Sequence, residues 1–410
     1  MLKMRKRQVI VVGAGPSGST AAFYLAKAGI DTLLVDKETW PRDKVCGDAQ
    51  LFGVFDIYKE MGIFEEAQAA AVNHMKGFTF SGVDENIASY FTPGEVTFSF
   101  CTPRRIIDDI IRRAAVEKAG ADFLQNFEVV DLIMRKGFVK GVRGVYNGEP
   151  VEVEADAIIL ANGSHSMQAR KLGIFNEDPD LAWYGARAYY EGVRGMDMRC
   201  IEEHLPHEMF YPAGYMWVFP EGEGIANIGV FITEKALAKS GMKIEDFFDW
   251  WRDNTKIGQE RLGQAKLLGE IKGWKLPSCR QLGDNVVNGC IAVGDAGNGI
   301  ECFTGEGFKE AMTSGKCAAG VMADAIKKGD VSKAALDIYT NLYGAEMNPY
   351  YQVMTMVREL IASDPEVYKD FIAWSKRHPK YPYIDTVEVW MGYMQEVLHI
   401  DFSAMMPKPE

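Results

Sequence analysis

The sequence predicts an α/β fold in which a parallel sheet flanked by helices is interrupted by an inserted β-rich domain and followed by a helical C-terminal extension. An apolar run over residues 8–12 leads through a glycine-rich turn and a helical segment into a second apolar run, residues 32–35. A similar strand and glycine turn recur far along the chain, at residues 289–297. The segments between them alternate and are rich in aromatic residues, as in strands, and the pattern beyond Asp330 is mostly helical.

The turn after the first strand has the spacing Gly13-x-Gly15-x-x-Gly18. Gly13 permits a tight turn, Gly15 lets backbone amides approach a pyrophosphate at a helix N-terminus, and Gly18 allows the helix to pack closely on the strand. Asp36 ends the second strand, where it can accept a hydrogen bond from a ribose hydroxyl. Strand, helix and acid all fit the context of this motif, so the sequence predicts a bound dinucleotide.

A second nucleotide signal follows the late strand, where Gly294-Asp-Ala-Gly297 precedes Gly305-Glu-Gly307 and a helix. Asp295 would face a ribityl or phosphate-side hydroxyl, and the positive N-terminus of the helix would point at the ligand. Two contact sets so far apart favour FAD over NAD. No second GxGxxG follows a strand, so no nicotinamide domain is expected, and NAD(P)H and ferredoxin both stay open as electron donor.

Composition sets the broad class of the protein. The 410 residues are 47% hydrophobic and 25% charged, as in globular proteins of two or three lobes. A net charge of −12 argues against nucleic-acid binding, because contacts to phosphates need clustered Lys and Arg. Seven cysteines without CxxC spacing suggest reduced thiols, and no apolar run is long enough to span a bilayer. We therefore expect a cytoplasmic protein with at most transient contact with a membrane surface.

The nucleotide domain is expected to be discontinuous, because β-rich segments separate its strands. The expected segments are 1–74, 104–170 and 275–330 for the FAD-binding domain, 75–103 and 171–274 for a substrate-binding β-sheet domain, and 331–410 for the helical region. Aromatic residues of the helical region are expected to be mostly core. They are Tyr350, Tyr351, Trp374, Tyr381, Tyr383, Trp390 and Tyr393.

Several of these segments resemble a known flavoprotein frame. Gly13 to Gly18, Arg104 with Asp108, and residues 156–163 and 294–307 resemble the FAD-binding frame of the p-hydroxybenzoate-hydroxylase-like flavoproteins. Within that superfamily, Pro41-Arg-Asp-Lys-Val-Cys-Gly-Asp48 and Tyr215-Met-Trp-Val-Phe-Pro220 resemble hallmark segments of the geranylgeranyl reductase family. The resemblance covers residues 5–330 and implies a Rossmann-like FAD-binding domain of the glutathione-reductase type.

The resemblance also implies which positions hold the cofactor. Arg104 would lie against the FAD pyrophosphate or ribityl chain, and Asp295 would lie on the ribityl side. Gly305 and Gly307 would lie against the pyrimidine edge of the flavin. Asn162 departs from the family, because an Asp is common at its position.

On the substrate side, the resemblance implies that Cys46 and Gly47 line the cavity in front of the flavin. Part of the pocket for a prenyl chain would come from Tyr215, Trp217, Phe219 and Pro220. Residues 301–304 replace the usual proline-containing approach to Gly305. This departure touches the flavin face, so the substrate stays open.

The expected function is an FAD-dependent reductase that saturates carbon-carbon double bonds of a prenyl or other apolar substrate, with hydride from flavin N5 and a proton from a nearby donor. Cys46 is the first candidate donor, because a thiol is mostly protonated at neutral pH, and Tyr215 is the second. A buried apolar cysteine and a pocket-wall tyrosine are the structural alternatives.

The alternative function is a flavin-dependent monooxygenase acting on a small apolar or aromatic molecule, because its frame resembles the same segments. A flavin halogenase fits less well, since the loop with its reactive lysine is not visible. A flavin carrier without catalysis would leave the large aromatic insertion unexplained.

Two smaller features are also interpreted. Cys302 lies in the loop expected to face the flavin, and a redox-sensitive pair of Cys46 and Cys302 is a hypothesis. His204 and His207 have a spacing seen in metal sites, but Pro206 between them breaks a helix. We therefore expect a surface turn there and no metal.

Overall fold

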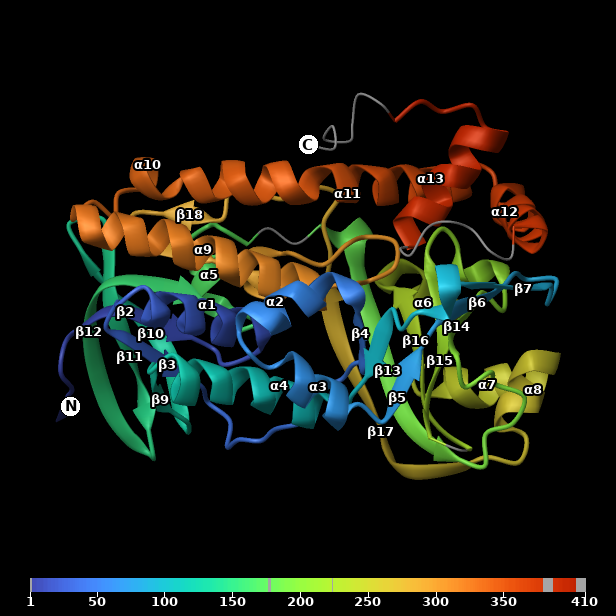
Figure 1. Cartoon of the computed structure of the whole chain (residues 1–410), viewed down its shortest axis with the longest axis horizontal. Helices are drawn as coiled ribbons and strands as arrows, with labels where there is room; N and C mark the ends of the chain where they lie inside the picture. Colours follow the sequence, from blue (N-terminus) through green and yellow to red (C-terminus); the bar gives the residue numbers. More distant parts are fainter. Residues whose placement is uncertain (1, 176–177, 223, 379–385, 403–410) are drawn as a thin grey trace.

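A mixed sheet of nine strands forms the lobe that carries the glycine-rich turn (Figure 1). The computed structural model describes residues 2–175, 178–222, 224–378 and 386–402. Five strands of this sheet run parallel, in the order β19-β12-β2-β3-β9. Their bounds are β2 (Arg7–Val12), β3 (Thr32–Val35), β9 (Asp122–Leu124), β12 (Glu149–Leu160) and β19 (Cys290–Ala292).

Antiparallel strands extend this sheet on the far side of β12. β10 (Phe127–Arg135) and β11 (Phe138–Tyr146) pair with each other, and β11 pairs with the first half of β12. Both connecting turns, Lys136-Gly137 and Asn147-Gly148, have positive φ at their two central residues, the geometry that fits tight hairpins. The three strands therefore form a meander. Two short strands, β1 (Leu2–Lys3) and β18 (Val286–Val287), complete the sheet.

Helix α1 (Pro16–Lys27) begins at the carboxyl ends of the parallel strands. Gly15 occupies its N-cap and Pro16 its first position, where a missing backbone N–H has no consequence. The small residues of its first turns are buried, and α9 (Phe308–Lys328) and α4 (Arg104–Arg113) pack against the helix. The N-terminus of α1 therefore opens at the edge of the sheet where α/β folds bind ligands.

A second sheet, of seven strands, forms the neighbouring lobe. Its order is β17 (Lys266–Pro277), β13 (Ala182–Glu191), β16 (Ile225–Thr233), β15 (Gly214–Gly222), β14 (Cys200–His204), β6 (Gly77–Ser81) and β7 (Ile87–Phe91). These strands come from both segments expected for the inserted domain. Helices α6 (Glu234–Ser240), α7 (Asp246–Asn254) and α8 (Lys256–Leu262) follow β16 in the chain.

The two lobes are joined by short elements between residues 49 and 101. A three-stranded sheet has the order β4 (Ala49–Leu51), β8 (Ser99–Cys101) and β5 (Asn73–Met75). It therefore combines residues that the sequence assigned to different domains. Two short helices, α2 (Phe55–Glu60) and α3 (Phe64–Ala70), lie between β4 and β5 in the chain. A third, α5 (Met167–Lys171), follows β12.

The C-terminal region is helical, as predicted, and it contacts both lobes. It consists of α10 (Lys333–Leu336), α11 (Ile338–Ser363), α12 (Glu366–Arg377) and α13 (Thr386–Val397). Helix α11 lies along α9 and extends toward α12 and α13, beside the seven-stranded sheet (Figure 1). Its first half, including Tyr343 and Tyr351, is buried in the core of the nucleotide lobe, whereas Met354 and Ile361 belong to the other core.

The aromatic residues of this region are mostly core. Tyr351, Trp374, Trp390 and Tyr393 are at most 1% exposed and Tyr350 is partly buried, whereas Tyr381 and Tyr383 lie outside the described residues. In the described part of the chain, no helix combines the length and the apolar character needed to cross a bilayer. The predicted fold class, an α/β frame with a β-rich insertion and a helical extension, is confirmed.

Candidate active site

One large cavity, of about 970 Å³, lies between the two lobes. Most positions singled out in the sequence line it: Gly13, Gly15, Asp36, Cys46, Gly47, Arg104, Tyr215, Trp217, Phe219, Asp295, Gly305 and Gly307. Gly18 lies behind the wall, packed against Gly13. Pro220 does not line the cavity either, because neighbouring residues of a strand point to opposite faces. This corrects the expected place of Pro220 in the pocket wall.

The glycine-rich turn is too tight for side chains at two of its three glycines. Gly13 has φ +100°, and a Cβ there would lie 2.3 Å from the carbonyl oxygen of Ala161. A Cβ at Gly18 would lie 1.8 Å from the carbonyl oxygen of Gly13. A Cβ at Gly15 would meet only the guanidinium of Arg42, at 3.4 Å, so Gly15 borders open space. The turn therefore forms a cradle bounded by backbone on one side and by Arg42 on the other.

Asp36 supports this turn from the end of β3. Its carboxylate accepts hydrogen bonds from the backbone N–H of Ala14, at 2.7 Å, and of Glu38, at 2.9 Å. A carboxylate has about four acceptor positions, so Asp36 can accept a further hydrogen bond from a ligand hydroxyl. Asp36 therefore shapes the cradle and also presents an acceptor to the cavity.

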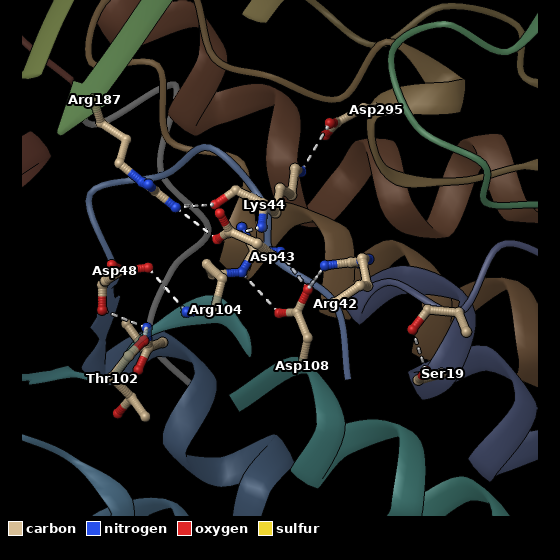
Figure 2. A network of polar contacts seen from close by, with 12 residues as sticks. Ser19, Arg42, Asp43, Lys44, Asp48, Thr102, Arg104, Asp108, Arg187 and Asp295 are labelled. Atoms are coloured by element: carbon tan, nitrogen blue, oxygen red, sulfur yellow. Dashed lines mark hydrogen bonds and ion pairs between the residues drawn. The ribbon is translucent and has the colours of Figure 1, made fainter. Parts of the chain in front are cut away.

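Arg104 lies at the cavity, but its guanidinium is bound to protein (Figure 2). Nε and one terminal nitrogen donate to Asp108, at 2.7 and 2.9 Å, and the guanidinium stacks over Phe308. Asp108 also accepts from Arg42, at 2.7 Å. Burial alone would raise the pKa of Asp108, but the charges of Arg104 and Arg42 outweigh it and lower that pKa.

Arg42 is the cation nearest Gly15, and it was singled out in the sequence only as part of a hallmark segment. In the sequence, Arg42 is distinguished only as a basic residue in the loop after the strand that Asp36 ends. The orientation of Arg42 depends on Asp108 and on stacking over Trp40, 66 and 2 residues away in the chain. A contact set of this kind is visible only in the folded protein.

The loop that follows Arg42 is fastened to both lobes (Figure 2). Asp43 accepts from Arg187 of β13, at 2.6 Å, and Lys44 pairs with Asp295, at 3.3 Å. Asp295 thus lies at the cavity wall, and a lysine shares its carboxylate. The loop containing Cys46 and Gly47 is therefore held between the two lobes.

A buried carboxyl pair fixes the end of this loop. Asp48 is fully buried and accepts from the backbone N–H of Arg104 and from the side chains of Tyr189 and Asn227. Burial, followed by the charge of Asp48, raises the pKa of Glu221 to about 9, so Glu221 keeps its proton at neutral pH and can share it with Asp48. Sequence analysis did not find this pair, because nothing in the spacing joins residues 48 and 221.

Cys46 and Gly47 lie against the aromatic face of β15. A Cβ at Gly47 would lie 2.4 Å from the ring of Phe219, so glycine is required for this approach. Trp217 is held by a hydrogen bond from its indole N–H to Asn227, at 3.0 Å, and Asn227 also donates to the Cys46 carbonyl, at 2.8 Å. One asparagine therefore fixes both sides of this part of the cavity.

A buried carboxylate shapes the loop before Gly305. Glu301 is fully buried and accepts from the backbone N–H of Phe303 and of Thr304 and from the Thr304 hydroxyl. This side chain imposes the turn and brings Gly305 to the cavity, where φ is +74° and a Cβ would collide with Phe231. Tyr215 donates its hydroxyl hydrogen to the Thr304 carbonyl, and so joins β15 to the same loop.

The hypothesis of a Cys46–Cys302 pair is wrong. Cys302 is fully buried, contacts the Thr355 hydroxyl at 3.4 Å and lies near the buried thiol of Cys279. Cys46 is partly exposed at the cavity. We expect a maleimide reagent to label Cys46 in the native protein and to reach Cys302 only after denaturation, as mapped by peptide mass analysis. Fast native labelling of Cys302, or a Cys46–Cys302 disulfide, would contradict this arrangement.

The expected surface turn at His204 is also wrong. His204 is fully buried at the end of β14, between the Ser81 hydroxyl at 2.9 Å and the Glu202 carboxylate at 3.0 Å. Glu202 pairs in turn with Arg261 of α8. Only His207 lies in a turn. Across the described residues, no three His, Cys, Asp or Glu side chains are grouped so that they could hold a metal ion.

The residues of the cavity fit FAD. A glycine cradle bordered by Arg42 suits a pyrophosphate, because the N-terminal amides of α1 point into it and its dipole favours negative charge. Asp36 presents an acceptor for ribose, and Asp295, Gly305 and Gly307 border the cavity at the start of α9. These two contact sets lie on one continuous wall, as a long dinucleotide requires.

Comparison with known proteins agrees with this geometry. Residues 6–189 match the family described as an FAD binding domain, and residues 194–266 match the geranylgeranyl reductase catalytic domain. A digeranylgeranylglycerophospholipid reductase of Methanosarcina acetivorans is 31% identical over 332 residues, 80% of this chain and 78% of the relative. A second such reductase, from Methanococcoides burtonii, is 28% identical over 372 residues, 90% of this chain and 87% of the relative.

Solved structures show the same fold. A geranylgeranyl bacteriochlorophyll reductase-like protein of Thermoplasma acidophilum superposes with a TM-score of 0.87, at 23% identity, over 98% of this chain and 100% of the other. A flavin-dependent brominase superposes with a TM-score of 0.73, at 20% identity, over 96% and 100%. At these identities the likeness concerns the fold alone.

The predicted FAD cofactor and the resemblance carried by the Cys46 and Tyr215 segments are both confirmed by these matches. The match to the catalytic domain covers β14 and β15, and β15 supplies the aromatic wall of the cavity. The chain belongs to the geranylgeranyl reductase family and is an FAD-dependent oxidoreductase of that type.

Proposed function

We propose that this protein saturates carbon-carbon double bonds in the geranylgeranyl chains of a glycerophospholipid. The observation that carries the proposal is a single cavity that continues from the glycine cradle to the aromatic face of β15. A nucleotide and an apolar chain can therefore lie in contact inside it. The names of the two similar reductases support the choice of a glycerophospholipid.

The walls of the cavity suit an alkene that carries no polar group. Trp217 and Phe219 are nearly buried, and Tyr215 lies beside them, so shape and apolar contact select the substrate. Bound FAD supplies the hydride equivalent that saturation requires. The protein's own side chains exclude water, hold the chain against the cofactor and provide the proton.

Cys46 and Tyr215 stay our proposed contacts for the reacting part of the substrate. Cys46 lies on the wall of the cavity and is partly exposed to it. Burial raises the pKa of Tyr215 well above 10, and its hydroxyl hydrogen is directed to the Thr304 carbonyl. The Tyr215 hydroxyl therefore orients the wall and the 301–305 loop.

The proposal includes transient contact with a membrane surface, where such a lipid resides. Met167 and Trp274 line the cavity and are 57% and 45% exposed, so apolar side chains border its mouth. Lys272, which also lines the cavity, pairs with Asp43 at 3.1 Å, and this pair would have to open for the cation to meet a lipid phosphate. Increasing ionic strength should weaken the association with anionic vesicles if this cation contributes.

Anaerobic turnover tests the proposed function directly. Protein reduced with dithionite under argon and mixed with digeranylgeranylglycerophospholipid should give products that are heavier by two hydrogens for every double bond removed. Dithionite makes the result independent of the natural electron donor, NAD(P)H or ferredoxin. Mass spectrometry of the extracted lipid measures the gain.

The fully saturated lipid is the control, because it contains no reducible bond and must leave reduced flavin unchanged. A strict need for oxygen and a product with one added oxygen atom would favour the monooxygenase alternative. Flavin that stays reduced in the presence of the unsaturated lipid would contradict both the reaction and the substrate.

A further inference from the structure

Glu203 is a carboxyl group on the cavity wall that the sequence did not single out. It lies on β14, where residue alternation directs Glu202 and His204 to one face and Ile201 and Glu203 to the other. Glu202 pairs with Arg261 of α8, whereas Ile201 and Glu203 line the cavity. Two neighbouring glutamates of one strand therefore have opposite surroundings.

The surroundings of Glu203 are apolar and aromatic. Its partners across the strands are Trp217 of β15 and Phe80 of β6. Together with Tyr215, Glu203 also lines a small adjoining cavity of about 30 Å³. The further walls of that small cavity include Phe371 and Trp390, from α12 and α13.

Among the residues that the structure describes, none pairs with the Glu203 carboxyl as a cation or donates a hydrogen bond to it. The titratable groups that face it are Glu306 and Glu301 of the loop, Tyr215 of β15 and Tyr368 of α12. All of them are neutral or negative, so none stabilises a carboxylate. Burial, followed by the charges of Glu306 and Glu301, raises the pKa of Glu203 to about 8.

The geometry points to Glu203 as the proton donor in the reduction of the double bond, an inference that rests on the proposed function. Saturation adds one hydride equivalent, supplied by the reduced cofactor, to one carbon and one proton to the other. The O–H bond of the Glu203 carboxylic acid breaks, a C–H bond forms, and a carboxylate remains. Water that enters after product release restores the proton.

Of the two other candidate donors, Tyr215 has its hydroxyl hydrogen directed to the Thr304 carbonyl. Cys46 also lines the cavity, so Cys46→Ala is compared with Glu203→Gln below. Of the three, only Glu203 is a carboxyl group, and no described residue pairs with it as a cation or donates a hydrogen bond to it. A neutral acid on an apolar wall can act as the general acid that saturation of the double bond requires.

Glu203→Gln removes the acidic proton and keeps the shape of the side chain. In a single anaerobic turnover, we expect flavin reoxidation by the unsaturated lipid to slow by about 100-fold, within the usual effect of losing a general acid. Glu203→Asp keeps the acid and should recover part of the rate. Glu208→Gln, an exposed acid of the same lobe, is the matched control and should behave like wild type.

Infrared spectroscopy of the oxidised holoprotein gives a readout independent of turnover. The carbonyl band of a protonated carboxyl should be present at pH 7, disappear from wild type with a midpoint near pH 8, and be absent in Glu203→Gln. The single-turnover rate should fall through the same pH range, because only the protonated acid can donate. Glu301 and Glu221 give bands of their own, so the difference from Glu203→Gln identifies the group.

Wild-type protein that reduces no lipid would contradict the proposed function, while the infrared band would still report the protonation of Glu203. Wild-type reduction together with an unchanged rate in Glu203→Gln would overturn the inference alone. The same conclusion would follow if Cys46→Ala or Tyr215→Phe abolished protonation of the product and Glu203→Gln did not. The inference would also be overturned if the difference spectrum between wild type and Glu203→Gln showed that Glu203 is ionised at pH 7.

Discussion

Gly15→Ala should fold normally and lose its flavin. The added Cβ would meet only the Arg42 guanidinium, at 3.4 Å, and the backbone of Gly15 has φ −64°, a conformation that alanine adopts freely. The methyl group would nevertheless occupy the cradle in which a pyrophosphate must approach the backbone amides. We expect the dissociation constant of FAD to rise by about 100-fold, close to 3 kcal/mol, measured by flavin fluorescence after reconstitution.

Two other glycines make this result interpretable. Gly320→Ala, in the exposed middle of α9, meets no atom within 4 Å and should leave both flavin content and stability near wild type. Gly13→Ala would collide with Ala161 and strain the turn, so it should reduce folding as well as binding. Full flavin occupancy in Gly15→Ala would show that the cradle is not the pyrophosphate site.

Asp108→Asn should be the most destabilising conservative substitution in the nucleotide lobe. Asp108 is fully buried and Arg104 is 4% exposed, so the amide would leave a buried guanidinium without its counter-charge. Loss of one partner of such a pair costs about 3–5 kcal/mol. Urea unfolding measures this loss, and flavin release should accompany it because Arg42 loses the carboxylate that orients it.

The Arg104–Asp108 pair should also affect how the free energy of unfolding depends on pH. Because the pKa of Asp108 is lowered in the folded state, its contribution to stability is complete above the unfolded value of about 3.9 and is lost as pH falls. Asp108→Asn should therefore lose less stability than wild type on acidification.

The neighbouring Asp109→Asn is the matched control. Asp109 pairs with Arg112 and Arg113 at the partly exposed face of α4, so its loss should cost at most about 1 kcal/mol. Equal effects of the two substitutions would show that burial does not govern the Arg104–Asp108 pair.

Much of the cofactor site could be predicted because its signals are local. Gly13 and Gly18 are required by backbone geometry, Gly15 leaves space for a ligand between them, and Asp36 follows at the end of the next strand. The late Gly294 to Gly307 segment indicated a second contact set, and both sets line one cavity. Such motifs can be interpreted from the sequence alone, because the turn and the start of the helix lie within one short segment.

The surroundings of Glu202 and Glu203 could not be predicted, because they depend on residues distant in the chain. Glu202 and Glu203 are identical in sequence terms, yet one is bound to Arg261 and the other faces aromatic rings. The wrong interpretations have the same origin. His204 lies in the core because β14 is buried at this position. Cys302 lies outside the cavity because hydrogen bonds to Glu301 set the course of its loop.

The sequence by itself determined the fold class, the FAD cofactor and the aromatic strand, because backbone turns, residue alternation and glycine spacing act over a few residues. Tertiary structure alone decided which charges meet, as in Arg42 with Asp108 and Glu221 with Asp48. The physical reason is that desolvation and Coulomb energy depend on distances between atoms, and folding sets those distances between segments far apart in the chain.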